Sequence, residues 1–116
     1  MRPLDDPGFA ACAREALAAD FDPVPWDEAS EWRRRVSAVV AESALDTNNP
    51  DHMRCAWTTE MCAMGWKWDR EFSEAAKTHP GIVFGELTRG GTKHWCEVAR
   101  RVRDVGRRLG VRMLGP

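Results

Sequence analysis

The sequence predicts one α+β domain that is mainly helical, and three observations support this. Four segments carry apolar residues at helical spacing and are separated by turns rich in proline, glycine and asparagine. A length of 116 residues is sufficient for one hydrophobic core. A short apolar triplet between glycines favours a strand or hairpin near residues 80–88 rather than a further helix.

The first two helices are expected on either side of a proline-rich connector. An Asp-Asp-Pro start signal precedes an apolar stripe over residues 8–19. The segment DFDPVPWD then holds two prolines, which cannot continue a helix and favour an extended chain. Asp27 is a suitable N-cap for the second helix. The apolar face of that helix holds Trp32, Val36, Val39, Val40 and Ala44.

The third and last helices have clear start and stop signals. Pro50 suits the first turn of a helix over residues 50–64, and Gly65 suits its end. Thr92 is a suitable cap for a last helix over residues 92–109, which ends before a glycine. The third helix carries the stripe Met53, Trp57, Met61 and Met64, and the last carries Trp95, Val98, Val102, Val105 and Leu109.

Composition and charge predict a soluble cytoplasmic protein without disulfides. The sequence is 43% hydrophobic, its formal net charge is −1, and no apolar run approaches 18 residues. The amino-terminal residues lack the basic-then-apolar order of a signal peptide. The four cysteines form no CxxC pair, so we expect free thiols and no bound metal.

The residues do not support a catalytic function. The histidines are His52, His79 and His94, and the sequence has neither a GxSxG nucleophile elbow nor a glycine-rich phosphate loop. The carboxylates near residue 70 are dense enough to be a solvated face. We therefore predict no catalytic residue and no cofactor, and we do not expect an enzyme.

The carboxyl-terminal segment is basic and leaves nucleic-acid binding open as an alternative. Residues 89–112 carry eight arginines or lysines against Glu97 and Asp104. Residues such as Arg100 and Arg103 are of the type that neutralises phosphates from a helix. An arginine-rich amphipathic helix is nevertheless more often a solvated face, so nucleic acid is not the partner that we expect first.

The tryptophans give a more specific signal. Trp57 belongs to the apolar stripe of the third helix, whereas Trp66 and Trp68 follow Gly65 two positions apart. If the chain is extended there, both indoles point the same way, with Lys67 nearby. Such a pair suits the stacking of a flat ring that carries an anionic group. The alternative is that these indoles close the hydrophobic core.

The spacing of these residues resembles the RyR domain, the repeat found in ryanodine receptor calcium-release channels and in small stand-alone proteins of bacteria and phages. The motifs that carry the resemblance are Pro23 and Pro25, Asn48, Trp57, Gly65-Trp66, Trp68, Lys77-Thr78-His79-Pro80, Ile82-Val83-Phe84, Leu87 and the last helix. The sequence departs from the pattern at Arg54, where the family has histidine, and at Asp69, where it has glycine. The match covers residues 21–110, so residues 1–20 are interpreted as an added helix and residues 111–116 as a tail.

The resemblance implies a fold and a class of ligand. It implies an α+β arrangement and a non-enzymatic module that senses an adenine nucleotide or a related signalling metabolite. Trp57 is then the foremost candidate for the stacking platform, with Trp66, Trp68 and His79 lining or supporting the pocket. Arg54 and Lys67 are the candidates for contact with phosphate. A protein-interaction module with exposed indoles as hot spots is the second hypothesis.

Overall fold

The computed structural model describes residues 2–114 and confirms a mainly helical domain with a short pair of strands. The described elements are, in chain order, α1 (Pro7–Ala18), the 3-10 turn η1 (Trp26–Glu28), α2 (Glu31–Asp46), α3 (Pro50–Ala63), β1 (Lys67–Trp68), β2 (Thr78–His79) and α4 (Arg89–Arg108).

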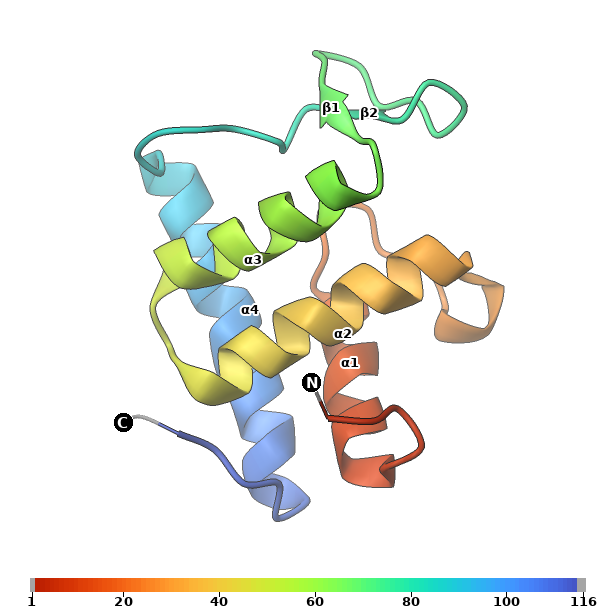
Figure 1. Cartoon of the computed structure of the whole chain (residues 1–116). Helices are drawn as coiled ribbons and strands as arrows, with labels where there is room; N and C mark the ends of the chain where they lie inside the picture. Colours follow the sequence, from red (N-terminus) through yellow and green to blue (C-terminus); the bar gives the residue numbers. More distant parts are fainter. Residues whose placement is uncertain (1, 115–116) are drawn as a thin grey trace.

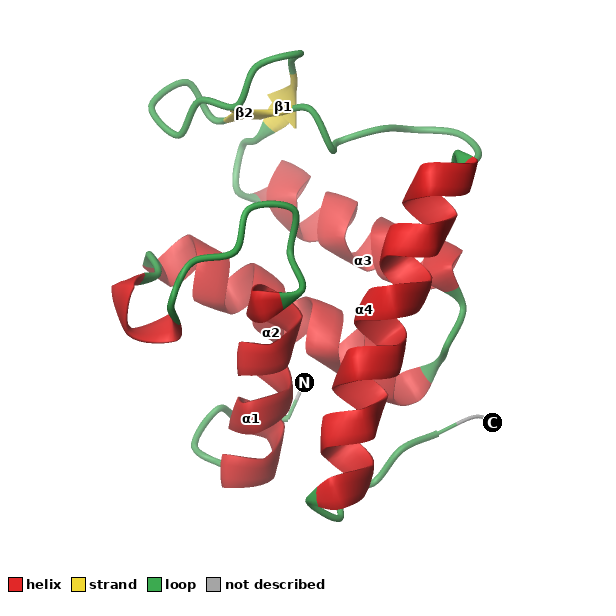
Figure 2. Cartoon of the chain, turned by 180° about the vertical axis from the view of Figure 1, so that it is seen from behind, coloured by secondary structure: helices red, strands yellow, loops and turns green. Residues whose placement is uncertain are grey.

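The helices pack in two layers. Helices α2 and α3 form one layer, and α1 and α4 lie side by side across it (Figures 1 and 2). The strand pair and the long connection from β2 to α4 lie at the end of the molecule where α3 stops (Figure 1). Residues 19–25 continue from the end of α1 toward this end of the molecule (Figure 2). This loop thereby contacts α3 and α4 through Phe21.

Helix α1 belongs to the same core as the rest of the domain. Its buried side chains follow the helical period, so one apolar stripe faces α2 and α4. These side chains are Phe9, Cys12, Ala13, Ala16 and Leu17. The segment from residue 111 also packs on the domain, because Val111 and Met113 contact the core and the amide of Leu114 donates to the carbonyl of Leu45 at 2.9 Å. Residues 115–116 lie outside the described residues.

The helix starts confirm the predicted place of Pro50 and correct the two predicted N-caps, Asp27 and Thr92. Asn49 caps α3, with Pro50 in the first turn as expected. Helix α2 begins at Glu31, because Asp27 lies in the 3-10 turn and the chain is extended again at Ser30. Helix α4 begins at Arg89 rather than near Thr92, because the side chain of Thr88 caps it by accepting from the amide of Gly91 at 3.0 Å.

Helix α3 ends in a Schellman motif. Gly65 has a φ of +90°, which a side chain at that position would disfavour. The amide of Gly65 donates to the carbonyl of Cys62 at 3.0 Å, and the amide of Trp66 donates to that of Met61 at 3.0 Å. Trp66 is therefore still bonded to the helix, and the extended chain begins only after it.

The strand pair precedes residues 80–88 rather than lying within them. Strands β1 and β2 are parallel, with Lys67 opposite Thr78 and Trp68 opposite His79. The predicted strand in 80–88 does not form because Pro80 lacks an amide donor and Arg54 takes the carbonyls of Val83 and Gly85. Ile82 alone of the apolar triplet is buried.

Candidate functional site

The six predicted site residues fall into two groups. Four are buried and two are exposed. The buried residues are Arg54, Trp57, Trp66 and His79, and the exposed residues are Lys67 and Trp68. Trp57 and His79 are brought together, with ring centroids 4.9 Å apart in an edge-to-face arrangement. The six residues do not share one open cleft.

Trp66 and Trp68 do not point the same way. Trp66 is 4% exposed and packs on Trp32 at 4.5 Å and on Phe72 at 5.9 Å between ring centroids. Trp68 is 56% exposed. The prediction of a shared face requires an extended chain through both residues, and the Schellman motif places Trp66 at the helix end instead. Trp66 therefore closes the core, as in the alternative interpretation.

Trp57 lies in a cluster of rings that we call the aromatic box. The box consists of Trp57, His79, His94 and Trp95, from α3, β2 and α4. Trp57 is only 3% exposed, and its ring centroid lies 6.1 Å from that of Trp95. The amide of Gly81 donates to Nδ1 of His79 at 2.8 Å, so the remaining ring nitrogen of a neutral His79 carries the proton.

Phe21 occupies the box. Its ring centroid lies 4.0 Å from that of His94 with the planes 19° apart, a stacked arrangement. It also lies 5.9 Å from Trp57, 6.0 Å from His79 and 5.8 Å from Trp95. Sequence reasoning missed Phe21 and His94. Two features of the sequence could have indicated them. Phe21 is an aromatic residue just before the Pro-x-Pro segment, and His94 lies next to Trp95 of the apolar stripe in the last helix.

Arg54 braces the connection between β2 and α4. One of its terminal nitrogens donates to the carbonyl of Val83 at 2.9 Å, and the other donates to the carbonyl of Gly85 at 2.7 Å and to Asp51 at 2.6 Å. The residue is 7% exposed, and its Nε is buried without a hydrogen-bond partner among the described residues. One donor of the guanidinium therefore remains unsatisfied.

A cleft of about 240 Å³ lies beside the box at the amino end of α4, and we call it the α4 cleft. Thr88 and Gly90 belong to the helix start, and open space lies where a side chain at Gly90 would project. The lining residues are Phe21, Arg54, Gly81, Val83, Leu87, Thr88, Gly90, Gly91 and Trp95. No Asp or Glu is among the described residues that line it. The α4 cleft combines aromatic walls with one guanidinium, that of Arg54, which is ion-paired with Asp51.

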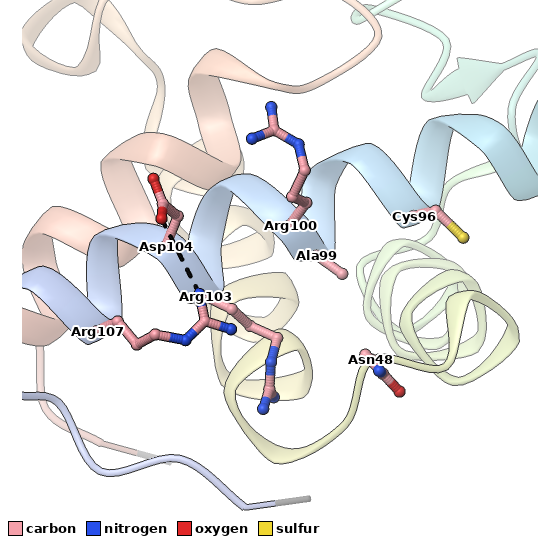
Figure 3. A pocket seen from close by; sticks show the side chains of 7 residues that line it. All are labelled: Asn48, Cys96, Ala99, Arg100, Arg103, Asp104 and Arg107. Atoms are coloured by element: carbon pink, nitrogen blue, oxygen red, sulfur yellow. Dashed lines mark ion pairs between the residues drawn. The ribbon is translucent and has the colours of Figure 1, made fainter. Parts of the chain in front are cut away.

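Two other hollows are less suited to an anionic ligand. A shallow groove of about 770 Å³ between α2 and α3 is bordered by Glu42 and Asp46. A cleft of about 300 Å³ on α4 is lined by several arginines, but Arg100 and Arg103 point in opposite directions from the helix (Figure 3). Arg107 pairs with Asp104 there, so the guanidinium groups do not converge on one point (Figure 3).

The predicted basic face of α4 is not a uniform surface. Arg103 is buried and donates to the carbonyls of Ala44 at 2.9 Å and Leu114 at 3.2 Å. Arg100 is exposed and pairs with Glu97 on the same helix. These two arginines, which the sequence placed together as phosphate contacts, therefore have different surroundings.

Burial perturbs three titratable groups around the box. Desolvation lowers the pKa of His94 below its ordinary value. Desolvation also lowers the pKa of His79, with a further lowering from the charge of Arg33 and an opposing effect of Asp22. Burial raises the pKa of Asp20 to about 6, although the hydrogen bond from the amide of Phe21 and the charge of Arg33 both lower it. Folding therefore shifts the protonation equilibrium of all three side chains toward the neutral form.

Within residues 2–114, no three His, Cys, Asp or Glu side chains are placed so that they could hold one metal ion. Cys12 is a buried thiol, and Cys55, Cys62 and Cys96 are exposed thiols. In the same part of the chain, no helix combines the length and the apolar character needed to cross a membrane.

The chain matches no protein-family model, no curated protein and no solved structure. The resemblance to RyR domains therefore stays a prediction from the motifs, and a function has to be inferred from the geometry of the site.

Proposed function

We propose that this protein is a non-enzymatic module that binds a small molecule with a flat ring and an anionic group, such as an adenine nucleotide or a related signalling metabolite. The observation that carries the proposal is the α4 cleft, where aromatic walls, the start of a 20-residue helix and a buried guanidinium meet. The resemblance to RyR domains favours the same class of ligand. The cytoplasm is the compartment in which we expect such a module to act.

The charge of the cleft favours an anion. The first N–H groups of a helix have no partner within the helix, and the helix dipole places partial positive charge there. Gly90 leaves the backbone of this turn uncovered. Arg54 adds a guanidinium whose charge is shared with Asp51, and its Nε has no hydrogen-bond partner among the described residues.

The walls of the cleft favour a ring. Phe21 and Trp95 both line it, and stacking of a base on an aromatic side chain contributes about 1–3 kcal/mol per base. The volume of about 240 Å³ is below the 300 Å³ or so at which ligand pockets usually begin. A nucleotide would therefore extend beyond the cleft or would require the aromatic box to open.

The proposal is tested by titrating ATP, ADP-ribose and cyclic AMP while reading tryptophan fluorescence. Gly90→Glu places a carboxylate in the cleft, at a helix start where it is compatible with the fold. We expect it to weaken binding at least tenfold, or about 1.4 kcal/mol. The matched control Gly90→Ala adds only a methyl group in open space and should change binding little. Unchanged fluorescence and melting temperature across this panel would reject the proposal.

Exposed apolar side chains favour a second candidate, a protein-interaction module. Phe84 is 76% exposed and Trp68 is 56% exposed, and a solvent-exposed indole is the type of side chain that anchors protein interfaces. This function predicts that the unaltered protein retains a protein partner in a pull-down and that Trp68→Ala does not. The circular dichroism spectrum of the variant should match that of the unaltered protein. Equal retention by both proteins would reject it.

A further inference from the structure

Phe21 is held in the aromatic box mainly by contacts between rings. All four rings of the box have centroids within 6.0 Å of that of Phe21. The amide of Phe21 donates to the side chain of the preceding Asp20 at 2.8 Å and not to α3 or α4. The residue lies between α1 and η1, outside any helix or strand. A rotation of the side chain would therefore remove the ring from the box without breaking a backbone hydrogen bond between elements.

Phe21 fills the box only in part. Phe21 is 46% exposed although Trp57 and Trp95 beneath it are each 3% exposed, so it lies at the mouth of the box with part of its surface in solvent. On the inner side, a gap of about 10 Å³ remains among Asp20, Trp57, His94 and Trp95, about the size of one water-sized probe. This gap is too small for a second ring, so a ligand ring can enter the box only in place of Phe21.

The box also contains a polar atom that a hydrocarbon ring cannot satisfy. Nε2 of His94 is buried and has no hydrogen-bond partner among the described residues. An unpartnered buried nitrogen is costly unless a ligand or water supplies the partner. A nitrogen heterocycle offers donors and acceptors at its edge, whereas the phenyl ring of Phe21 offers none.

We infer that Phe21 is a resident substitute for the ligand, and that the planar nitrogen heterocycle of an anionic ligand enters the aromatic box when Phe21 leaves it. The inference rests on the proposed function and specifies its site. Phe21 and Trp95 border both the box and the α4 cleft. One ligand therefore places its ring in the box and its phosphate or carboxylate at the amino end of α4 beside Arg54.

The test compares the unaltered protein with Phe21→Ala, using AMP as the ligand with both groups and benzimidazole as the ring alone. Phe21→Ala removes the competing ring, so the affinity for AMP should rise by about fivefold or more, since a site that must first open binds more weakly in proportion to its open fraction. Benzimidazole should raise the melting temperature of Phe21→Ala and not that of the unaltered protein. Phe84→Ala removes an exposed phenyl ring outside the box and should behave as the unaltered protein does.

The outcomes separate this inference from the proposed function. If AMP binds the unaltered protein but binds Phe21→Ala no better, and benzimidazole does not bind the variant, Phe21 is not a substitute and the proposed function stands. If benzimidazole binds the variant but AMP binds neither protein, the box accepts a ring and the anionic part of the proposed function fails. If no probe binds either protein, both are rejected.

A second measurement does not depend on the variant folding. In the unaltered protein, the ring protons of Phe21 should show ring-current shifts from the stacked His94 and its neighbours. Saturation with AMP should move these resonances toward the values of an exposed phenylalanine. Resonances that stay in place while AMP binds elsewhere would overturn the inference.

Discussion

Phe21 stacks on His94 across the molecule, with ring centroids 4.0 Å apart and planes 19° from parallel, although 72 positions separate the two residues in the sequence. This contact joins the loop after α1 to the first half of α4 and covers Trp57 and Trp95. Protonation of His94 should weaken the packing of the aromatic box, because burial disfavours the charged imidazolium.

His94→Phe should reduce the loss of stability at acid pH. Because burial lowers the pKa of His94 below 6.5, the unfolded chain binds the proton first as pH falls, and acid favours unfolding. Phenylalanine keeps a ring against Phe21 and cannot be protonated. The difference in melting temperature between pH 7.5 and pH 5 should therefore be smaller in the variant. Part of the difference will remain, because the pKa of His79 is lowered as well.

Exposed His52 provides the control for this measurement. His52→Phe should leave the pH dependence as it is in the unaltered protein. If His94→Phe gives the same change between the two pH values as the unaltered protein, His94 does not contribute to the acid sensitivity.

Asp20→Asn should stabilise the fold at neutral pH and not at acid pH. Burial raises the pKa of Asp20 from 3.8 to about 6, so the folded protein holds this proton more tightly than the unfolded chain does. Stability therefore falls as pH rises from about 4 to about 6 and stays lower above that range. Asparagine keeps an oxygen that accepts from the amide of Phe21 and has no charge to bury.

The expected gain of Asp20→Asn is at most about 3 kcal/mol in the free energy of unfolding at pH 7.5, which corresponds to the rise in pKa. Urea denaturation at pH 7.5 and pH 4 measures it. Asp27→Asn, at an exposed position on η1, should give no gain at either pH. A gain of the same size at both pH values would show that the charge of Asp20 is not the cause.

Arg54→Lys should destabilise the protein despite keeping the charge. A guanidinium reaches two carbonyls and a carboxylate at once, and the ammonium of lysine, a single point charge with a shorter reach, does not reproduce this planar arrangement. We expect a loss of about 1–3 kcal/mol in urea denaturation, together with faster proteolysis between β2 and α4. Arg35→Lys, at an exposed side chain that keeps its charge next to Glu60, should have little effect. Equal stability of the two variants would contradict this role of Arg54.

The sequence predicted the helices better than the site, because helix signals are local. Gly65 ends α3 as predicted, since a positive φ and the bonds of a Schellman motif depend on neighbouring residues alone. The same motif directs Trp66 into the core, whereas Trp68 is exposed. The prediction of a shared face was wrong because it assumed that the extended chain begins before Trp66.

The rest of the site depends on contacts between distant residues. Phe21 follows α1 in an otherwise acidic and proline-rich segment, and no periodicity connects it to His94 or Trp57. Arg54 lies next to the predicted apolar stripe of α3 and was predicted as a phosphate contact, whereas its carbonyl partners are about 30 positions away in a loop. Only the packing of the helices brings such residues together.

Arg103→Ala should destabilise the protein strongly, whereas Arg100→Ala should not. The side chain of Arg103 donates to the carbonyls of Ala44 and Leu45, which belong to the last turn of α2 and have no partner within that helix, and to the carbonyl of Leu114. Its removal takes this donor from the carbonyls of Ala44 and Leu114, whereas the carbonyl of Leu45 keeps the amide of Leu114. We expect a loss of about 2–4 kcal/mol in urea denaturation.

Arg100 provides the matched comparison, because it lies one turn away on α4 and its partner Glu97 is exposed as well. Arg100→Ala should leave the midpoint of denaturation unchanged. The pair also sharpens the alternative of nucleic-acid binding: weaker retention of RNA or DNA by Arg103→Ala would reflect loss of the fold, whereas weaker retention by Arg100→Ala with Arg107→Ala would indicate a phosphate contact. An Arg103→Ala variant as stable as the unaltered protein would show that water replaces the guanidinium at the end of α2.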